Sequence, residues 1–277
     1  MHAAMQLWLH QDGSGGRLKA GYGLAFRISW HMPQANRDGY KEYKINHIPR
    51  SIFFDLDKNS KKNTNLPHML TDKQDWEKIV SQMGISQNDK IIIYDNSDVI
   101  SACRCWYNFI YFGHDPKKVH VLNGGLKKWN KENKITNNEE VIIKTSKYSC
   151  IENTDLVKSK KQIDENIVKK KFYVIDARSK ERFEGKVSEP RKGLRSGSIK
   201  NSFCLPYSEL INEDHTFISK DKILKKFDSL KFDLDQNLVF SCGSGITASV
   251  LALAYSLIND KYRPCIYDGS WAEYGII

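Results

Sequence analysis

The feature that most constrains the fold of this chain is an internal repeat. Residues 90–129, KIIIYDNSDVISACRCWYNFIYFGHDPKKVHVLNGGLKKW, match residues 237–274, NLVFSCGSGITASVLALAYSLINDKYRPCIYDGSWAEY, in order and spacing. In each copy an apolar strand is followed by a short loop, a helix, a second strand and a glycine-containing turn. The repeat predicts an α/β protein with two tandem domains, each a mostly parallel sheet flanked by helices.

The changes in composition along the chain suggest four segments. Residues 1–27 are glycine-rich without clear periodicity, and we interpret them as an atypical N-terminal lead. The first domain is expected over residues 28–135 and the second over residues 154–277, beginning with a helix over Thr154–Asn166. Between them, residues 136–153 are polar and rich in lysine and asparagine, which is typical of a linker.

The charge of the chain is strongly basic, with 43 Lys and Arg against 33 Asp and Glu and a net charge of +10. The lysines are scattered, and no basic run is interleaved with aromatic residues as a single-strand nucleic-acid platform requires. We therefore expect a solvated lysine-rich surface and no nucleic-acid partner. A basic cleft that attracts small anionic substrates stays open as an alternative.

The cysteines argue against a metal site and for a reducing compartment. Six cysteines occur without C-x-x-C spacing, so we predict no zinc site, and we expect no other cofactor. The sequence has neither an apolar run that could cross a membrane nor a secretion signal at its start. These features predict a cytoplasmic protein with free cysteines and no membrane partner, and we expect a monomer.

The second copy carries a cysteine between the end of a predicted strand and the start of a predicted helix. The apolar strand Leu238–Phe240 leads to Cys242, and Gly243, Ser244 and Gly245 then separate it from a helix that begins at about Thr247. Backbone N–H groups at a helix start favour an anion, so a thiol there loses its proton more easily and becomes a nucleophile. The alternative is a buried structural cysteine beside a helix start, which the two flanking glycines make less fitting.

The first copy lacks this thiol. The position equivalent to Cys242 is Asp95, and a carboxylate cannot perform thiol chemistry. We therefore expect the first domain to be a non-catalytic structural partner that forms one wall of the site.

The chain resembles the rhodanese-like sulfurtransferase family, in particular its members that use 3-mercaptopyruvate. The resemblance runs from about Ser29 to the C-terminus. The matching motifs are SWHMP at 29–33, RD at 37–38, HIP at 47–49, FFDLD at 53–57, HML at 68–70, DAR at 176–178, RFEG at 182–185, EPR at 189–191, CGSGITA at 242–248 and YDGSWAEYG at 267–275.

The resemblance implies a ping-pong reaction. The thiolate of Cys242 attacks the sulfur of 3-mercaptopyruvate, pyruvate leaves, and the cysteine becomes a persulfide. A second thiol, such as that of reduced thioredoxin, or cyanide in the laboratory, then takes the outer sulfur. No cofactor takes part.

The resemblance also assigns roles to individual residues. It implies that Arg182 and Arg191 hold the substrate carboxylate, although their spacing alone fits two surface arginines equally well. Further substrate contacts are implied for the loop residues Gly243, Gly245, Ile246 and Thr247.

A serine–histidine–aspartate relay is the other implied feature of the site. The resemblance implies a catalytic role for Ser244, with His47 and Asp38 brought near it from the first domain. A histidine before Ile-Pro is also common as a structural loop residue. His68 is placed near the interdomain cleft without a defined role.

Two other functions fit the same fold. A thiosulfate sulfurtransferase of this family usually carries charged residues directly after the cysteine, whereas this loop has the neutral Gly243 and Ser244. A non-catalytic sulfur carrier or regulatory module is the other alternative, and an intact cysteine loop argues against it. Phosphatase chemistry is disfavoured because Ala248 and Ser249 stand where a phosphate-binding arginine would close the loop.

Overall fold

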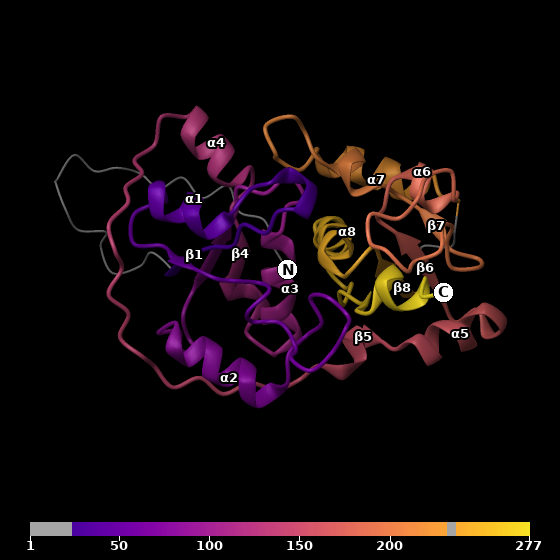
Figure 1. Ribbon diagram of the computed structural model, residues 1–277, viewed down its shortest axis with the longest axis horizontal. Helices are drawn as coiled ribbons and strands as arrows, with labels where there is room; N and C mark the ends of the chain where they lie inside the picture. The colour runs from indigo at the N-terminus through magenta and orange to yellow at the C-terminus, as the bar shows by residue number, and fades with distance from the viewer. Residues whose placement is uncertain (1–23, 232–236) are drawn as a thin grey trace.

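Two parallel sheets, one in each half of the chain, define the architecture in Figure 1, a computed structural model that describes residues 24–231 and 237–277. The first sheet has the order β2-β1-β3-β4 and the second the order β5-β9-β8-β6-β7, with parallel pairing throughout. The strands are β1 Leu24–Arg27, β2 Ile52–Phe53, β3 Ile91–Tyr94, β4 Val119–Val121, β5 Val157–Lys158, β6 Phe172–Asp176, β7 Phe203–Cys204, β8 Asn237–Ser241 and β9 Ile266–Tyr267. The predicted fold class is confirmed.

Helices flank both sheets. They are α1 Gly39–Ile45, α2 Lys73–Gln82, α3 Ala102–Tyr111, α4 Gly125–Lys131, α5 Lys160–Lys169, α6 Lys180–Phe183, α7 Lys220–Asp228, α8 Ile246–Ser256 and α9 Ser270–Tyr274. Short 3-10 turns cover Pro33–Ala35, Pro116–Lys118, Thr154–Leu156 and Tyr207–Leu210. Among the residues that the structure describes, no helix is long and apolar enough to cross a bilayer.

The two halves meet along α3 and α8, the helices that follow the central strands of the two repeats (Figure 1). Every residue of α3 is buried, and α8 is apolar on nearly all sides, as expected for helices that pack in an interior. Asp95 and Cys242, the equivalent residues that directly follow β3 and β8, begin the loops that lead into these two helices.

The expected N-terminal boundary of the first domain is wrong. Strand β1 (Leu24–Arg27) lies between β2 and β3, so the sheet includes residues that we had assigned to the lead. The apolar pattern is interrupted by Arg27, whose guanidinium is buried and pairs with Glu42 at 3.1 Å. A buried arginine with a partly exposed partner therefore interrupts the hydrophobic pattern of this strand. Residues 1–23, the rest of the predicted lead, lie outside the described residues.

The helix predicted over Thr154–Asn166 is also wrong at its start. A 3-10 turn over Thr154–Leu156 leads into β5, and α5 begins only at Lys160. Ser159 caps α5 through a reciprocal capping box with Gln162, which fixes the start of the helix at that point.

The linker over residues 136–153 runs around the outer edge of the first domain and passes α2 (Figure 1). Its backbone is bonded to that helix: Ser146 N donates to Ser81 O at 2.9 Å and Tyr148 N to Ser81 Oγ at 3.0 Å. Tyr148 and Cys150 are buried against the first domain. The linker is therefore anchored to the first domain at these positions, although it contains neither a helix nor a strand and much of it is exposed.

Candidate active site

The cysteine loop holds its thiol beneath the start of α8. Cys242 directly follows β8 and is 1% exposed. The Gly245 N–H donates to Cys242 Sγ at 3.1 Å, and Gly245 has φ +81°, a left-handed conformation that glycine adopts without strain. A backbone donor at the N-terminus of an 11-residue helix stabilises negative charge on the sulfur.

A cavity of about 150 Å³ opens over this sulfur. It brings together Cys242 and six other predicted site residues, which are Arg182, Arg191, Gly243, Ser244, Ile246 and Thr247. The opposite wall comes from the first domain, through Trp30, Met32, Pro33, Gln34 and Val99. The site is therefore closed by both domains, and its size suits a small organic acid.

The two predicted arginines lie above the loop but differ in their partners. A Cβ placed on Gly243 would lie 3.3 Å from Arg182 Nη2 and 3.8 Å from Arg191 Nη1. Arg182 is held by the buried carboxylate of Glu189, with Nε–Oε1 3.1 Å and Nη2–Oε2 2.6 Å. Within the described residues, Arg191 has no hydrogen bond or ion pair, which leaves its guanidinium available to a ligand.

The burial of Arg191 also favours the binding of an anion. Burial lowers the pKa of this guanidinium, while the nearby Cys242 sulfur raises it. A carboxylate that enters the pocket stabilises a partly buried cation without a partner, because the attraction between the two charges offsets the loss of water from each group.

A proton relay crosses the domain interface. Ser244 Oγ lies 2.9 Å from His68 Nδ1, and His68 Nε2 lies 3.1 Å from Asp57 Oδ1. Asp57 also accepts a hydrogen bond from Trp30 Nε1 at 3.2 Å, and the Trp30 ring packs edge-on against His68. The serine belongs to the second domain, whereas the histidine and the carboxylate belong to the first.

The electrostatics of the relay favour a neutral imidazole. Burial lowers the pKa of His68, and the hydrogen bond from His68 holds the pKa of Asp57 below its usual range. A neutral ring that donates from Nε2 to Asp57 has an acceptor at Nδ1. His68 is therefore arranged to take a proton from the hydroxyl of Ser244.

The predicted placement of His47 and Asp38 in this relay is wrong. His47 is buried in the first domain, where its ring nitrogens bond to Tyr43 O at 2.8 Å and Glu139 O at 3.1 Å. Asp38 caps α1 by accepting the N–H groups of Tyr40 and Lys41. Both side chains therefore bond to backbone groups. Asp38 lies at the start of α1 and His47 lies just after its last residue, so neither reaches the cleft.

The sequence contains a signal that could have located the relay. His68 precedes α2 as His215 precedes α7 at the equivalent position of the other repeat, and both residues have positive φ, +60° and +64°. A histidine retained at the same strained position in both copies indicates a role that spacing from a single motif does not reveal.

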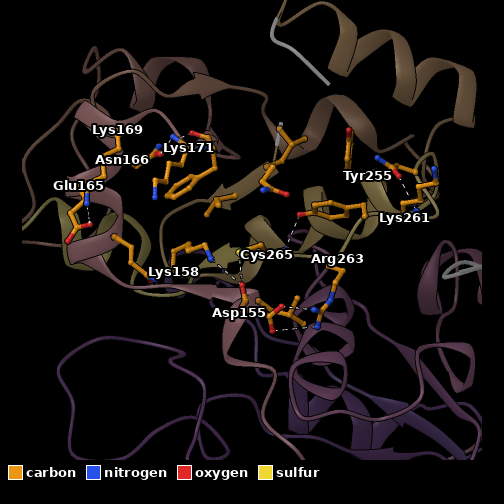
Figure 2. Close-up of a pocket in the computed structure, with 18 residues that line it drawn as sticks. Asp155, Lys158, Glu165, Asn166, Lys169, Lys171, Tyr255, Lys261, Arg263 and Cys265 are labelled. Carbon is orange, nitrogen blue, oxygen red and sulfur yellow. Dashed lines mark hydrogen bonds and ion pairs between the residues drawn. The ribbon is translucent and has the colours of Figure 1, made fainter. Parts of the chain in front are cut away.

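A larger cavity lies elsewhere. Figure 2 shows this cavity of about 650 Å³ at the start of β6 and β8, whereas Cys242 follows the end of β8. Charged residues on its wall neutralise each other in two ion pairs, Arg263–Asp155 at 2.6 Å and Lys169–Glu165 at 2.7 Å. Burial raises the pKa of the Cys265 thiol on its wall to about 12, which disfavours the thiolate form.

In residues 24–231 and 237–277 no group of three His, Cys, Asp or Glu side chains could hold a metal ion.

Two α/β domains that close over one loop-held cysteine define the class: a tandem-domain protein in which the second copy carries the cysteine loop and the first copy brings His68 and Asp57 to Ser244 of that loop. Comparison with known proteins gives the family. The model of the Rhodanese-like domain matches residues 37–132 and 159–276, and the chain belongs to this family.

Its relatives are sulfurtransferases. The chain is 36% identical to thiosulfate/3-mercaptopyruvate sulfurtransferase 1, mitochondrial, of Arabidopsis thaliana, over 96% of this chain and 74% of the relative. It is 34% identical to the 3-mercaptopyruvate sulfurtransferase of Mus musculus, over 89% and 82%. The crystal structure of SseA from Escherichia coli, a 3-mercaptopyruvate sulfurtransferase, matches with a TM-score of 0.80 and 29% identity, covering 90% of this chain and 93% of that one.

Proposed function

We propose that this sulfurtransferase moves the sulfur of 3-mercaptopyruvate through a persulfide on Cys242 to a thiol acceptor and releases pyruvate. The observation that carries the proposal is the unpaired guanidinium of Arg191 above the buried thiol. The name of the relative from Mus musculus supports the same donor, and the name of the relative from Arabidopsis thaliana gives both thiosulfate and 3-mercaptopyruvate.

The charge of the pocket favours a donor with one carboxylate over thiosulfate. Glu189 neutralises Arg182, and the residues directly after the cysteine, Gly243 and Ser244, carry no charge. One free guanidinium, that of Arg191, then matches one carboxylate bidentately. Thiosulfate, a dianion, would bring a second charge that the loop does not compensate.

In the first half-reaction the thiolate of Cys242 forms a bond to the substrate sulfur, and the C–S bond breaks with its electron pair moving to carbon. The enolate of pyruvate results. The thiol proton of the substrate passes through Ser244 to His68 and returns to the enolate carbon, so the products are pyruvate and the persulfide anion. Cleavage of the C–S bond reduces the carbon, and the transferred sulfur is oxidised to the sulfane state.

In the second half-reaction an acceptor thiolate attacks the outer sulfur and restores the thiolate of Cys242. The N–H of Gly245, 3.1 Å from Sγ in the resting site, supports negative charge on the sulfur in both half-reactions. Reduced thioredoxin is the proposed acceptor, and cyanide would give thiocyanate in the laboratory. We also propose that the protein acts as a monomer in the cytoplasm, where its six free cysteines stay reduced.

Parallel assays with two donors test the proposal. Pyruvate and thiocyanate would be measured with 3-mercaptopyruvate or thiosulfate as donor and cyanide as acceptor, and we expect the higher kcat/KM with 3-mercaptopyruvate. Intact mass after donor alone should show the gain of one sulfur atom in the wild type and none in Cys242→Ser. Cys204→Ser, at a half-buried thiol outside the cavity, is the matched control. A higher kcat/KM with thiosulfate would reject the proposed donor.

A further inference from the structure

A buried ion pair joins the two domains beside the relay. Arg104 Nη2, on α3, lies 2.7 Å from Asp268 Oδ1, directly after β9, and the side chains are 0% and 4% exposed. An ion pair this deeply buried costs desolvation free energy that the mutual attraction does not generally return. Its presence at this interface therefore calls for a role beyond adhesion.

Both members of the pair bond to the backbone segment that carries the relay histidine. Arg104 Nη2 donates to His68 O at 2.6 Å, and Leu70 N donates to Asp268 Oδ2 at 2.8 Å. His68 has φ +60°, a conformation that side chains other than glycine adopt at a cost, so contacts from outside must hold it.

The same pair also contacts the loop on the other side of the relay. A Cβ on Gly245 would lie 2.7 Å from Arg104 Nη1 and 3.3 Å from Asp268 Oδ1. In the turn that begins at Asp268, Ser270 Oγ accepts a hydrogen bond from Cys242 N at 3.2 Å. The pair is thus packed between the histidine segment of one domain and the cysteine loop of the other.

The internal repeat provides a comparison within the molecule. Asn123 in the first repeat is equivalent to Asp268 in the second. Asn123 lies two residues after Val121, which pairs with Ile93 of β3. Asp268 lies two residues after Ile266, which pairs with Phe240 of β8. Asn123 Oδ1 accepts a hydrogen bond from Phe217 N of the opposite domain at 2.8 Å, as Asp268 does from Leu70 N. A neutral amide is therefore sufficient to dock the domains at the equivalent contact.

We propose that Arg104 and Asp268 are positioning residues that hold His68 Nδ1 on Ser244 Oγ across the domain interface. The kinetic consequence rests on the proposed sulfurtransferase mechanism, whereas the placement of His68 does not. One carboxylate with two acceptor oxygens serves both Arg104 and the Leu70 N–H, which an amide cannot do, because its NH₂ group would face one of the two donors.

The test compares Asp268→Asn with Asn123→Ala, its docking counterpart. The first readout is the ¹⁵N spectrum of the His68 imidazole, which reports its tautomer and hydrogen bonds. The second is the single-turnover rate of pyruvate release together with KM. For Asp268→Asn we expect loss of the hydrogen-bonded Nδ1 signature and a rate lower by about 10- to 100-fold, as for a misplaced catalytic group. KM should change little because Arg191 is untouched.

The control and the second variant keep the proposal falsifiable. Asn123→Ala should lower the melting temperature but keep the wild-type rate and His68 spectrum. If Asp268→Asn fails to fold because Arg104 is left unpaired, the double variant Arg104→Met with Asp268→Asn removes both charges and should show the same loss. A wild-type His68 spectrum and rate in the folded variants, or an equal loss in Asn123→Ala, would overturn the proposal. If the wild type itself releases no pyruvate, the proposed function fails while the His68 spectrum still decides the role of the pair.

Discussion

His68 Nδ1 lies 2.9 Å from Ser244 Oγ although the two residues belong to different repeats. The cysteine loop of the second domain is therefore incomplete without the first. In the proposed mechanism this relationship gives the first copy, which has Asp95 in place of a thiol, a function in the reaction, because it supplies His68, Asp57 and one wall of the cavity.

Removal of the relay histidine should affect turnover more than binding. For His68→Ala we expect kcat to fall by about 10²- to 10⁴-fold, the usual contribution of general acid–base catalysis, with a small change in KM. Steady-state pyruvate release measures both constants. His47→Ala is the control: it removes the ring contacts to the Tyr43 and Glu139 carbonyl oxygens, one of them only partly buried, and should cost about 1–3 kcal/mol of stability while kcat is retained. A reversed pattern would return the relay to His47.

Removal of the unpaired guanidinium should affect binding. Arg191→Gly loses charge-assisted hydrogen bonds to the substrate carboxylate, and we expect KM for 3-mercaptopyruvate to rise by about 10- to 100-fold. Arg263→Gly removes an equal charge at the cavity shown in Figure 2 and should leave KM unchanged. Equal KM values in the two variants would exclude Arg191 from carboxylate binding.

Substitution of the loop glycine tests how tightly the cysteine is enclosed. Gly245→Ala introduces a side chain at φ +81° and places its Cβ 2.7 Å from Arg104 Nη1. Gly193→Ala has a similar φ of +78° but nothing within 4 Å, so it isolates the backbone strain, about 1–3 kcal/mol. We expect Gly245→Ala to lower the free energy of unfolding by more than this control does, as measured by urea denaturation. Equal losses of unfolding free energy in the two variants would mean that the loop accommodates the added methyl group.

The buried carboxylate of the first repeat should make stability depend on pH. Burial raises the pKa of Asp95 to about 7, so the native state binds more protons than the unfolded state between about pH 4 and 7. The contribution of Asp95 to stability is therefore complete below pH 4 and is lost as the pH rises through 7, with a slope of at most about 1.4 kcal/mol per pH unit. Asp95→Asn should flatten the dependence of the unfolding free energy on pH over this range.

An exposed residue of the same loop provides the comparison. Asp98 has a side chain that is 70% exposed, and Asp98→Asn should leave the slope unchanged. Urea denaturation at several pH values measures both variants. A steep slope that persists in Asp95→Asn would assign the titration to another group.

The sequence predicted the repeated units and the reactive loop because both are local. The strand Leu238–Phe240, the glycines around Ser244 and the apolar α8 lie within one continuous segment, where periodicity and backbone preferences act over a few residues. The same pattern in residues 90–129 predicted the tandem architecture and identified Asp95 as the equivalent of Cys242.

Tertiary structure alone decided which side chains complete the site. His47 and His68 both lie in or next to turns in the first domain, and only the packing of α3 against α8 brings His68, rather than His47, to Ser244. Strand β1 was concealed because the charge of Arg27 is neutralised by Glu42 across the fold. In both cases the deciding contact joins residues that are distant in sequence, and such contacts leave no local pattern in the chain.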